Sequence, residues 1–258
     1  MTRLIVIASG KGGVGKTTLT TNLSAALSDF GEDVIAIDAN MTTPNLGLHT
    51  GMHLVPNTLH DVLKGNIKLK DSIYPHPYGF KIIPASMSLE ALENVDPSKL
   101  QEITFSLLGQ ADYIVMDCAA GLGREALSAL SASNEMILVT NPNLPAVTDA
   151  LKILKLAQDT KLDVLGVIIN RVNGNSKELT TEEIQELLNI NIIGEIPEDK
   201  NLFKALSKKQ NIFEHSPYSP AAVEIKRIAA NISGRHYEAP KMRTTRNLIQ
   251  RVAFWMSK

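Results

Sequence analysis

The chain has 258 residues, of which 44% are hydrophobic and 21% are charged, and its formal net charge is −1. This size and composition are those of an ordinary globular protein that can bury a substantial core in one large α/β domain. The small net charge gives no overall signature of nucleic-acid binding, so only local basic patches remain as candidates.

No stretch approaches the ~20 apolar residues of a membrane span, and the N-terminal apolar run is too short for a signal peptide. We therefore expect a cytoplasmic protein. The single cysteine, Cys118, excludes an intrachain disulfide and a Cys-x-x-Cys metal site. We interpret it as a small residue behind the end of a strand.

Strand-like and helix-like segments alternate along the chain, which predicts an α/β fold: a doubly wound, mainly parallel sheet with helices on both faces. Several strand candidates are continuous apolar runs, as expected where both faces are covered. The predicted strands are Leu4–Ala8, Val34–Asp38, Phe80–Ile83, Tyr113–Asp117, Met136–Thr140, Val164–Asn170 and Ile192–Ile196. The predicted helices are Lys16–Phe30, Pro97–Leu108, Arg124–Ala132, Ala146–Asp159, Thr181–Leu188 and Pro220–Ile232.

The first predicted strand leads directly into a glycine-rich loop, and a helix pattern follows. The loop matches the phosphate-binding P-loop pattern G-x-x-x-x-G-K-[ST] in the strand–loop–helix setting that the pattern requires. Glycines let successive N–H groups face one phosphate chain, and the helix adds the positive end of its dipole. We expect Lys16 to reach the terminal phosphates and Thr17 to offer its hydroxyl to Mg²⁺. A purely structural glycine loop is the weaker alternative. The loop reads Gly10-Lys11-Gly12-Gly13-Val14-Gly15-Lys16-Thr17-Thr18.

Two aspartates stand at the ends of predicted strands, where open α/β sheets bind their ligands. Asp38 ends the second strand candidate and Asp117 ends the fourth. A buried carboxylate needs a partner, and Mg²⁺ bound to ATP would supply one. The sequence therefore predicts that Asp38 and Asp117 help to hold the metal. A simple strand-end cap is the alternative role of Asp117.

The run from Lys11 to Thr18 resembles the deviant P-loop of the MinD/ParA family of dimeric ATPases, which are P-loop NTPases of the SIMIBI type. The resemblance implies that Lys11 reaches across a dimer interface to the nucleotide of the partner subunit. An added cation helps there because negative charge accumulates. A solvated surface lysine is the alternative. Related iron–sulfur proteins supply paired cysteines, which this chain lacks, so we expect no cluster.

Two further segments resemble the switch loops of that family. The run from Asp117 to Gly121 matches a D-x-x-A-G segment, which implies that Asp117 acts on Mg²⁺ through water and that Gly121 senses the γ-phosphate. The run from Asp38 to Leu46 keeps the family's first aspartate but carries Asn40 in place of the second. Asparagine can hydrogen-bond water but is no general base. We therefore expect slow ATP hydrolysis by positioning alone, unless Asn40 is an engineered change that traps the ATP state.

Two later loops resemble the family's base-binding segments. Asn170 and Arg171 end a predicted strand, and the resemblance implies that the asparagine reads the adenine edge with its donor and acceptor. Pro197 and Glu198 belong to a loop that closes over the base in relatives. A turn residue at the end of a strand is the alternative role of Asn170.

The composition changes near the C-terminus. Residues 234–243 lack apolar periodicity and predict a linker, which follows an ATPase domain at residues 1–233. Residues 244–258 predict an amphipathic helix with flanking cations, which suits an anionic membrane surface. MinD proteins end in such a helix, whereas packing on its own domain is the alternative. The apolar stripe consists of Leu248, Ile249, Val252, Trp255 and Met256.

Together these features predict a MinD-like ATPase that uses ATP/ADP and Mg²⁺ and forms an ATP-dependent homodimer. We expect it to bind the inner face of the cell membrane peripherally and to position an unidentified partner protein, for example at the division site. A ParA-like partitioning ATPase that binds DNA nonspecifically, with Lys208-Lys209 and Lys226-Arg227 as basic patches, is the alternative. A P-loop synthetase acting on a small carboxylate or amide is a third hypothesis, for which the sequence identifies no substrate pocket.

Overall fold

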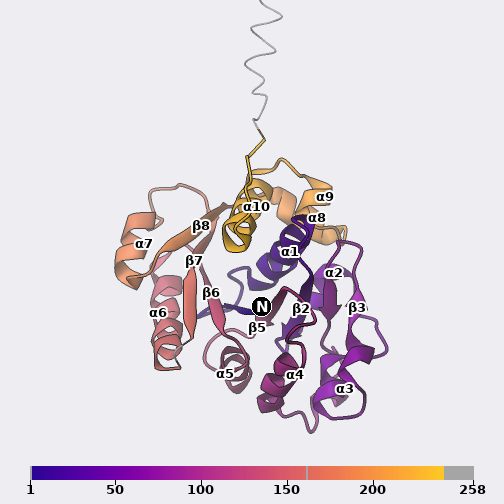
Figure 1. Ribbon diagram of the computed structural model, residues 1–258. Coiled ribbons are helices and arrows are strands. Elements are labelled where there is room, and N and C mark those ends of the chain that lie inside the picture. The colour runs from indigo at the N-terminus through magenta and orange to yellow at the C-terminus, as the bar shows by residue number, and fades with distance from the viewer. Residues whose placement is uncertain (1, 161, 241–258) are drawn as a thin grey trace, which may run out of the picture.

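The computed structural model describes residues 2–160 and 162–240. One eight-stranded sheet runs through this part of the chain in the order β3-β4-β2-β5-β1-β6-β7-β8 (Figure 1). All neighbouring strands are parallel except β3 and β4. This confirms the predicted doubly wound, mainly parallel sheet. The strands are β1 (Arg3–Ala8), β2 (Val34–Ala39), β3 (Tyr74–Pro75), β4 (Lys81–Ile83), β5 (Tyr113–Cys118), β6 (Glu135–Thr140), β7 (Asp163–Val172) and β8 (Ile192–Pro197).

Helices cover both faces of the sheet (Figure 1). One face carries α3 (Leu59–Leu63), α4 (Leu100–Ser106), α5 (Arg124–Ser131), α6 (Leu144–Asp159) and α7 (Thr181–Leu188). The other face carries α1 (Lys16–Asp29), α2 (Leu46–Thr50), α8 (Lys200–Ser207), α9 (Ile212–His215) and α10 (Pro220–Ser233). Short 3-10 turns are η1 (Leu69–Ser72), η2 (Glu90–Leu92) and η3 (Pro97–Lys99).

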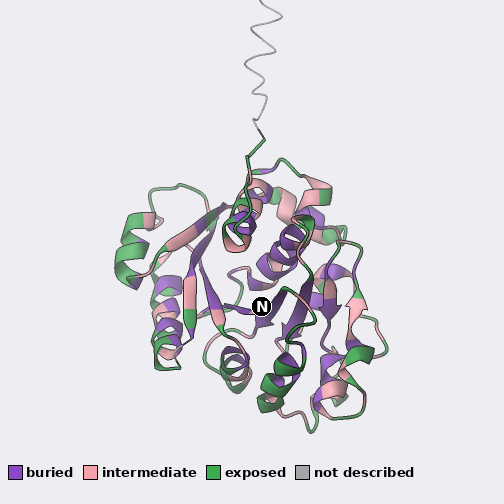
Figure 2. Cartoon of the chain, viewed as in Figure 1, coloured by how far each residue is buried: buried purple, intermediate pink, exposed green. Residues whose placement is uncertain are grey.

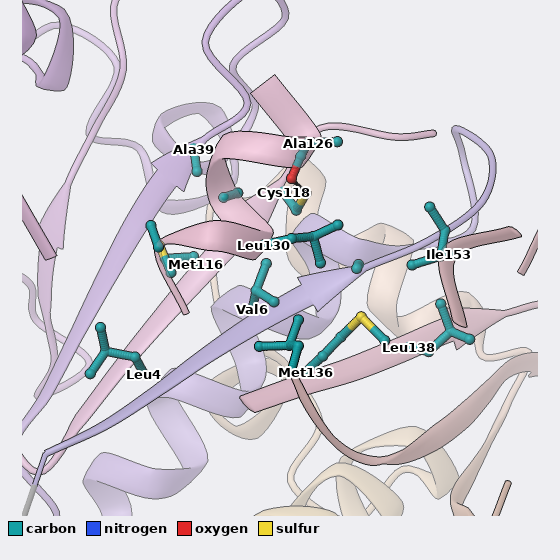
Figure 3. Close-up of a cluster of buried hydrophobic side chains, with 14 of the residues drawn as sticks. Leu4, Val6, Ala39, Met116, Cys118, Ala126, Leu130, Met136, Leu138 and Ile153 are labelled. Carbon is teal, nitrogen blue, oxygen red and sulfur yellow. Dashed lines mark hydrogen bonds between the residues drawn. The ribbon is translucent and has the colours of Figure 1, made fainter. Parts of the chain in front are cut away.

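The strands contribute side chains to two apolar layers, because successive residues of a strand point to opposite faces. In β1, Leu4, Val6 and Ala8 belong to the layer under α5 and α6, whereas Ile5 and Ile7 belong to the layer under α1 and α10. Figure 3 shows the first layer, where side chains of β1, β5 and β6 lie close to α5 and α6. The central strands are buried and the outer helix faces are exposed (Figure 2). Burial on both faces explains the continuous apolar runs in the sequence.

Most of the elements that differ from the prediction are short or contain proline, and α8 is the exception. α6 begins at Leu144 rather than at Ala146, because Pro145 is tolerated in the first turn and Asn143 caps the helix. The predicted helix Pro97–Leu108 divides into η3 and α4. The prediction lacks β3, α2, α3 and α9, which are too short to show a period, and also α8, whose amphipathic period it missed.

The strand order brings three chain segments to one edge of the sheet. β5 lies between β1 and β2. The register pairs Asp117 of β5 with Ile7 of β1 on one side and with Asp38 of β2 on the other. The carboxyl ends of parallel strands meet at the same edge, so both aspartates lie where the glycine-rich loop leaves β1.

The described chain ends shortly after α10. Gly234 follows this helix in the left-handed conformation, with a φ of 67° that suits a helix C-terminus. The whole predicted tail helix, residues 244–258, and the last three residues of the predicted linker lie outside the described residues. Among the residues that are described, no helix is both long enough and apolar enough to span a membrane.

Candidate nucleotide-binding site

The loop between β1 and α1 has a backbone path that requires glycine. Gly13 and Gly15 have φ values of 78° and 104°, and a Cβ on Gly15 would lie 2.2 Å from Nδ2 of Asn170. A Cβ on Gly10 would lie 2.2 Å from the backbone of Asp149 in α6. Side chains at these positions would clash or strain the backbone. The predicted P-loop therefore adopts a conformation in which β7 and α6 approach its backbone closely.

Lys16 is the first residue of α1 and is buried, with a relative exposure of 8%. Its Nζ donates to Oγ of Ser9 at 2.8 Å, and this hydroxyl donates to the backbone oxygen of Lys11 at 2.7 Å. Burial lowers the pKa of Lys16, and the nearby Asp117 opposes that shift. An ammonium group has three donors, so Lys16 retains donors for phosphate oxygens. Sequence reasoning missed Ser9, although a polar residue at the end of an apolar strand is a usable signal.

Two buried carboxylates lie side by side beneath the loop. Asp38 and Asp117 are only 0% and 1% exposed. Burial, and then the charge of Asp117, raise the pKa of Asp38, and burial raises the pKa of Asp117 to about 6. Asp38 accepts hydrogen bonds from the backbone N–H groups of Asn40 and Leu46. Asp117 accepts a hydrogen bond at 2.6 Å from the hydroxyl of Thr17 through Oδ2, while its Oδ1 is buried without a partner among the described residues.

This arrangement of oxygen atoms fits a divalent cation. An unpartnered buried carboxylate oxygen is unfavourable on its own, and hydroxyl and carboxylate oxygens are the ligands that Mg²⁺ prefers. Thr17, Asp38 and Asp117, the residues predicted for the metal, thus lie together at one point of the site. A bound Mg²⁺ would be held there by the Thr17 hydroxyl and the neighbouring carboxylates, and it would offset the charge of the phosphates.

The P-loop and the segment after β2 line a cavity of about 430 Å³. Asn40 lines it, and its carboxamide is held by Thr43: Nδ2 donates to the backbone oxygen of Thr43 at 2.6 Å, and Oδ1 accepts from its hydroxyl at 3.0 Å. His49 also lines this cavity, and burial lowers its pKa to about 4. The P-loop residues on the cavity wall are Gly12, Gly13, Gly15, Lys16, Thr17 and Thr18.

A neighbouring cavity of about 160 Å³ brings together the four residues predicted to bind the base. Asn170 and Arg171 lie just before Val172, the last residue of β7. Pro197 ends β8 and Glu198 begins the next loop, and the side chains of Arg171 and Glu198 are 3.8 Å apart. Asn170 Nδ2 donates to the backbone oxygen of Val14 at 2.7 Å. One donor of this amide therefore supports the P-loop, and its remaining N–H and its carbonyl oxygen stay available for a base.

Sequence reasoning missed the other wall of this second cavity. Leu202, Phe203 and Leu206 of α8 line it, and Phe203 is 75% exposed. The signal was present, because an aromatic residue shortly after the predicted base loop is a natural stacking surface. Because the prediction did not include α8, it could not assign these side chains to the base-binding site.

Two predicted roles belong to residues that do not line these two cavities. The side chain of Lys11 is exposed, and Lys11 is not among the described residues that line either of these two cavities. The backbone N–H of Gly121, predicted to sense the γ-phosphate, donates to the backbone oxygen of Ser9 at 3.1 Å. Gly121 therefore joins the segment after β5 to the start of the P-loop.

The fold and the site define a P-loop nucleotide-binding protein of the α/β class. A family model described as the CobQ/CobB/MinD/ParA nucleotide binding domain matches residues 5–212. The chain belongs to this family, which confirms the resemblance seen in the sequence.

Individual relatives agree with this assignment. An uncharacterized ATP-binding protein of Methanocaldococcus jannaschii is 41% identical over 235 residues, which cover 91% of this chain and 89% of the relative. The septum site-determining protein MinD of Thermotoga maritima is 33% identical over 214 residues, covering 80% and 79%. The structure of MinD from Pyrococcus horikoshii, complexed with Mg-ADP, is similar with a TM-score of 0.87 and 38% identity, covering 90% of this chain and 96% of that one.

The paired carboxylates generate a prediction about stability. Folding raises the pKa of Asp117 to about 6, so the folded protein binds a proton at this group more tightly than the unfolded chain does. The contribution of Asp117 to the free energy of unfolding therefore falls as the pH rises from about 4 through 6. At pH 7.5, Asp117→Asn should raise the free energy of unfolding of the nucleotide-free protein by about 1–3 kcal/mol, and the gain should vanish below about pH 4. Urea unfolding at both pH values measures this.

The same substitution should weaken Mg²⁺-dependent binding of ADP, because it removes a negative charge from the cation site. Asp163→Asn, at an exposed carboxylate, is the matched control and should change neither quantity. An Asp117→Asn protein that is less stable than the parent at pH 7.5 would contradict the prediction.

Proposed function

We propose that this protein is an ATP-dependent dimerising switch of the MinD type. In this proposal two subunits sandwich ATP, the dimer binds an anionic membrane surface, and hydrolysis releases it. The position of Lys11 supports the proposal most directly. Lys11 lies in the P-loop but is exposed and does not line the two cavities described above, whereas Lys16 is buried and lines the cavity at the P-loop. A cation in that place suits the phosphates of a nucleotide held by a second subunit.

The proposed hydrolysis depends on positioning. Lys16 and the P-loop N–H groups would hold the phosphates, and Asn40 at the cavity wall would hydrogen-bond the attacking water. A carboxamide cannot accept the proton of that water at neutral pH. The proposed reaction is therefore slow, and the ATP-bound dimer persists long enough to act at a surface.

The proposed membrane binding rests on the sequence of the tail. We propose an ATPase domain at residues 1–233, a linker at 234–243 and a membrane-binding helix at 244–258. A helix of this length is marginal in water, and one such helix binds a membrane weakly and reversibly. Joining two tails makes the second insertion intramolecular, which raises the overall affinity without any new contact. ATP would thereby control localisation between the cytoplasm and the inner face of the cell membrane.

The relatives support a partner and a division-site role for this switch. A solved structure of an Aquifex aeolicus MinC:MinD cell division protein complex is 29% identical to this chain, and two of the relatives described above are septum site-determining proteins. We propose an analogous partner protein here. DNA binding stays the alternative: Lys208 and Lys209 of one candidate basic patch are exposed, whereas at the other patch Lys226 pairs with Asp29 and Arg227 pairs with Glu224. These pairs leave little free positive charge at that candidate patch.

The trans role of Lys11 predicts a selective defect. Lys11→Ala should bind ADP within about twofold of the parent but should fail to dimerise with ATP, because its cation acts only where a second subunit's phosphates add negative charge. Size-exclusion chromatography with light scattering, in ATP and in ADP, measures the dimer. The exposed Lys177→Ala serves as the control. Equal losses of ADP binding and of dimerisation would place Lys11 within its own subunit's site.

The second prediction concerns Asn40. Asn40→Asp supplies a carboxylate that can accept a proton, and a general base is typically worth about 10²–10⁴-fold. We expect this substitution to raise ATP turnover by about tenfold or more and to shorten the lifetime of the dimer. A phosphate-release assay measures turnover. Unchanged or slower turnover would mean that another group activates the water.

The third prediction concerns the tail. Trp255→Glu should abolish binding to anionic vesicles while ATP-dependent dimerisation persists, because a charge would have to leave water. Vesicle sedimentation with ATP and with ADP measures this, and Trp255, the only tryptophan, reports insertion through its fluorescence. Ser257→Glu adds the same charge opposite the apolar stripe and is the matched control. A Trp255 emission that is blue-shifted without lipid and unmoved by vesicles would place the helix on its own domain instead.

A further inference from the structure

The segment that follows β2 is anchored at several points. The backbone N–H of Asn40 donates to Oδ1 of Asp38 at 3.3 Å. Met41 is only 1% exposed and belongs to the apolar layer that α5 covers. Thr42 and Thr43 are exposed. The buried Met41 thus fixes the start of the segment, while the positions of Thr42 and Thr43 depend on other contacts.

Glu125, the second residue of α5, supplies such a contact. The backbone N–H of Thr42 donates to its Oε2 at 3.2 Å, and the Thr42 hydroxyl donates to its Oε1. Both carboxylate oxygens therefore hold one residue. Hydrogen bonds to an ionised acceptor are stronger than neutral ones, and two together also fix orientation.

This contact joins the two segments that flank the nucleotide site. α5 follows the segment from Asp117 to Gly121, which contacts Thr17 and Ser9 of the P-loop region. Thr42 belongs to the segment that carries Asn40. Glu125 itself is absent from the residues that line either cavity within 2–160 and 162–240. It therefore acts on the position of other groups and not on the nucleotide directly.

The chain of contacts leads from Glu125 to Asn40. In the part of the chain that the structure describes, the carboxamide of Asn40 hydrogen-bonds only to Thr43. Thr43 is joined through one peptide bond to Thr42, which Glu125 holds. Nδ2 of Asn45 also donates to the backbone oxygen of Thr43, at 2.8 Å, so the contact of Thr42 with Glu125 is one of two anchors of Thr43. If Thr42 is released, Thr43 keeps only one of them, and the Asn40 carboxamide is held less firmly in its direction.

We propose that Glu125 is a positioning residue for nucleotide hydrolysis, which holds Asn40 at the wall of the nucleotide cavity by binding Thr42. The inference rests on the proposed function, because hydrolysis is the reaction in which Asn40 would act. A small misplacement of a positioning group is sufficient to slow a reaction strongly.

Variants at position 42 test the contact without altering α5. Thr42→Val keeps the branched shape but removes the hydroxyl, whereas Thr42→Ser keeps the hydroxyl. We expect Thr42→Val and Glu125→Ala to lower kcat by about ten- to a hundredfold, with the KM for ATP within about threefold of the parent. Thr42→Ser should turn over at least about fivefold faster than Thr42→Val. Arg124→Ala, at the exposed neighbour of Glu125, is the control.

A second measurement does not depend on activity. Backbone hydrogen exchange of residues 40–46 in the nucleotide-free protein should be faster in Glu125→Ala and Thr42→Val than in Thr42→Ser. If Glu125 only stabilised α5 through its charge in the first turn, Glu125→Ala would lower Tm. Thr42→Val would then change neither Tm nor the hydrogen exchange of residues 40–46.

A double substitution tests the route through Asn40. If Glu125 acts through Asn40, Asn40→Ala combined with Glu125→Ala should have the kcat of Asn40→Ala alone. A further loss in the double variant would overturn the proposal, and so would equal kcat and equal exchange in Thr42→Val and Thr42→Ser. A parent that hydrolyses no ATP would overturn the proposed function and this role together. A parent that hydrolyses ATP with no effect of Thr42→Val would overturn this role only.

Discussion

The pairing of Asp38 with Asp117 across neighbouring strands is the constraint on which the rest of the site depends. Two carboxylates side by side in a nearly closed environment are unfavourable when both are charged. Burial raises the pKa of both groups, and the charge of Asp117 raises the pKa of Asp38 further. Neighbouring hydrogen-bond donors partly offset this cost. Two backbone N–H groups donate to Asp38, and the Thr17 hydroxyl donates to Asp117. A bound cation would complete the balance, so metal and nucleotide binding would stabilise an edge of the sheet that is electrostatically unfavourable without them.

The positive groups of the site follow from the same constraint. Lys16 is buried next to Asp117 and therefore tolerates a low-dielectric position that lowers its pKa. Its contact with Ser9 keeps the ammonium group hydrogen-bonded at the root of the loop. Lys11 has no comparable environment and remains in solvent. Two lysines five residues apart in one loop thus differ in burial, which is consistent with the proposal that Lys16 serves its own site and Lys11 the site of a second subunit.

The sequence predicts those parts of the fold and the site that are encoded locally. The P-loop, Asp38, Asp117 and the ends of β7 and β8 are recognisable because each stands at the end of an apolar run, and parallel strands bring such ends together. Ser9, Phe203 and the contact of Thr42 with Glu125 were not predicted. The last two residues are 83 positions apart in the chain, and nothing in the local pattern of either segment indicates the other. Short elements such as β3 and α9 were not predicted either, because they contain too few residues to show a hydrophobic period.

The contact between Gly10 and α6 has a mechanical consequence. No room exists for even a methyl group between the first residue of the P-loop and the backbone at Asp149. Between most elements side chains intervene, and they can change rotamer to absorb a small displacement. Here two main chains abut, and no such adjustable layer separates them. A shift of the loop toward the helix is therefore transmitted to the helix as a rigid displacement, which couples the shape of the phosphate-binding loop to the outer face of α6.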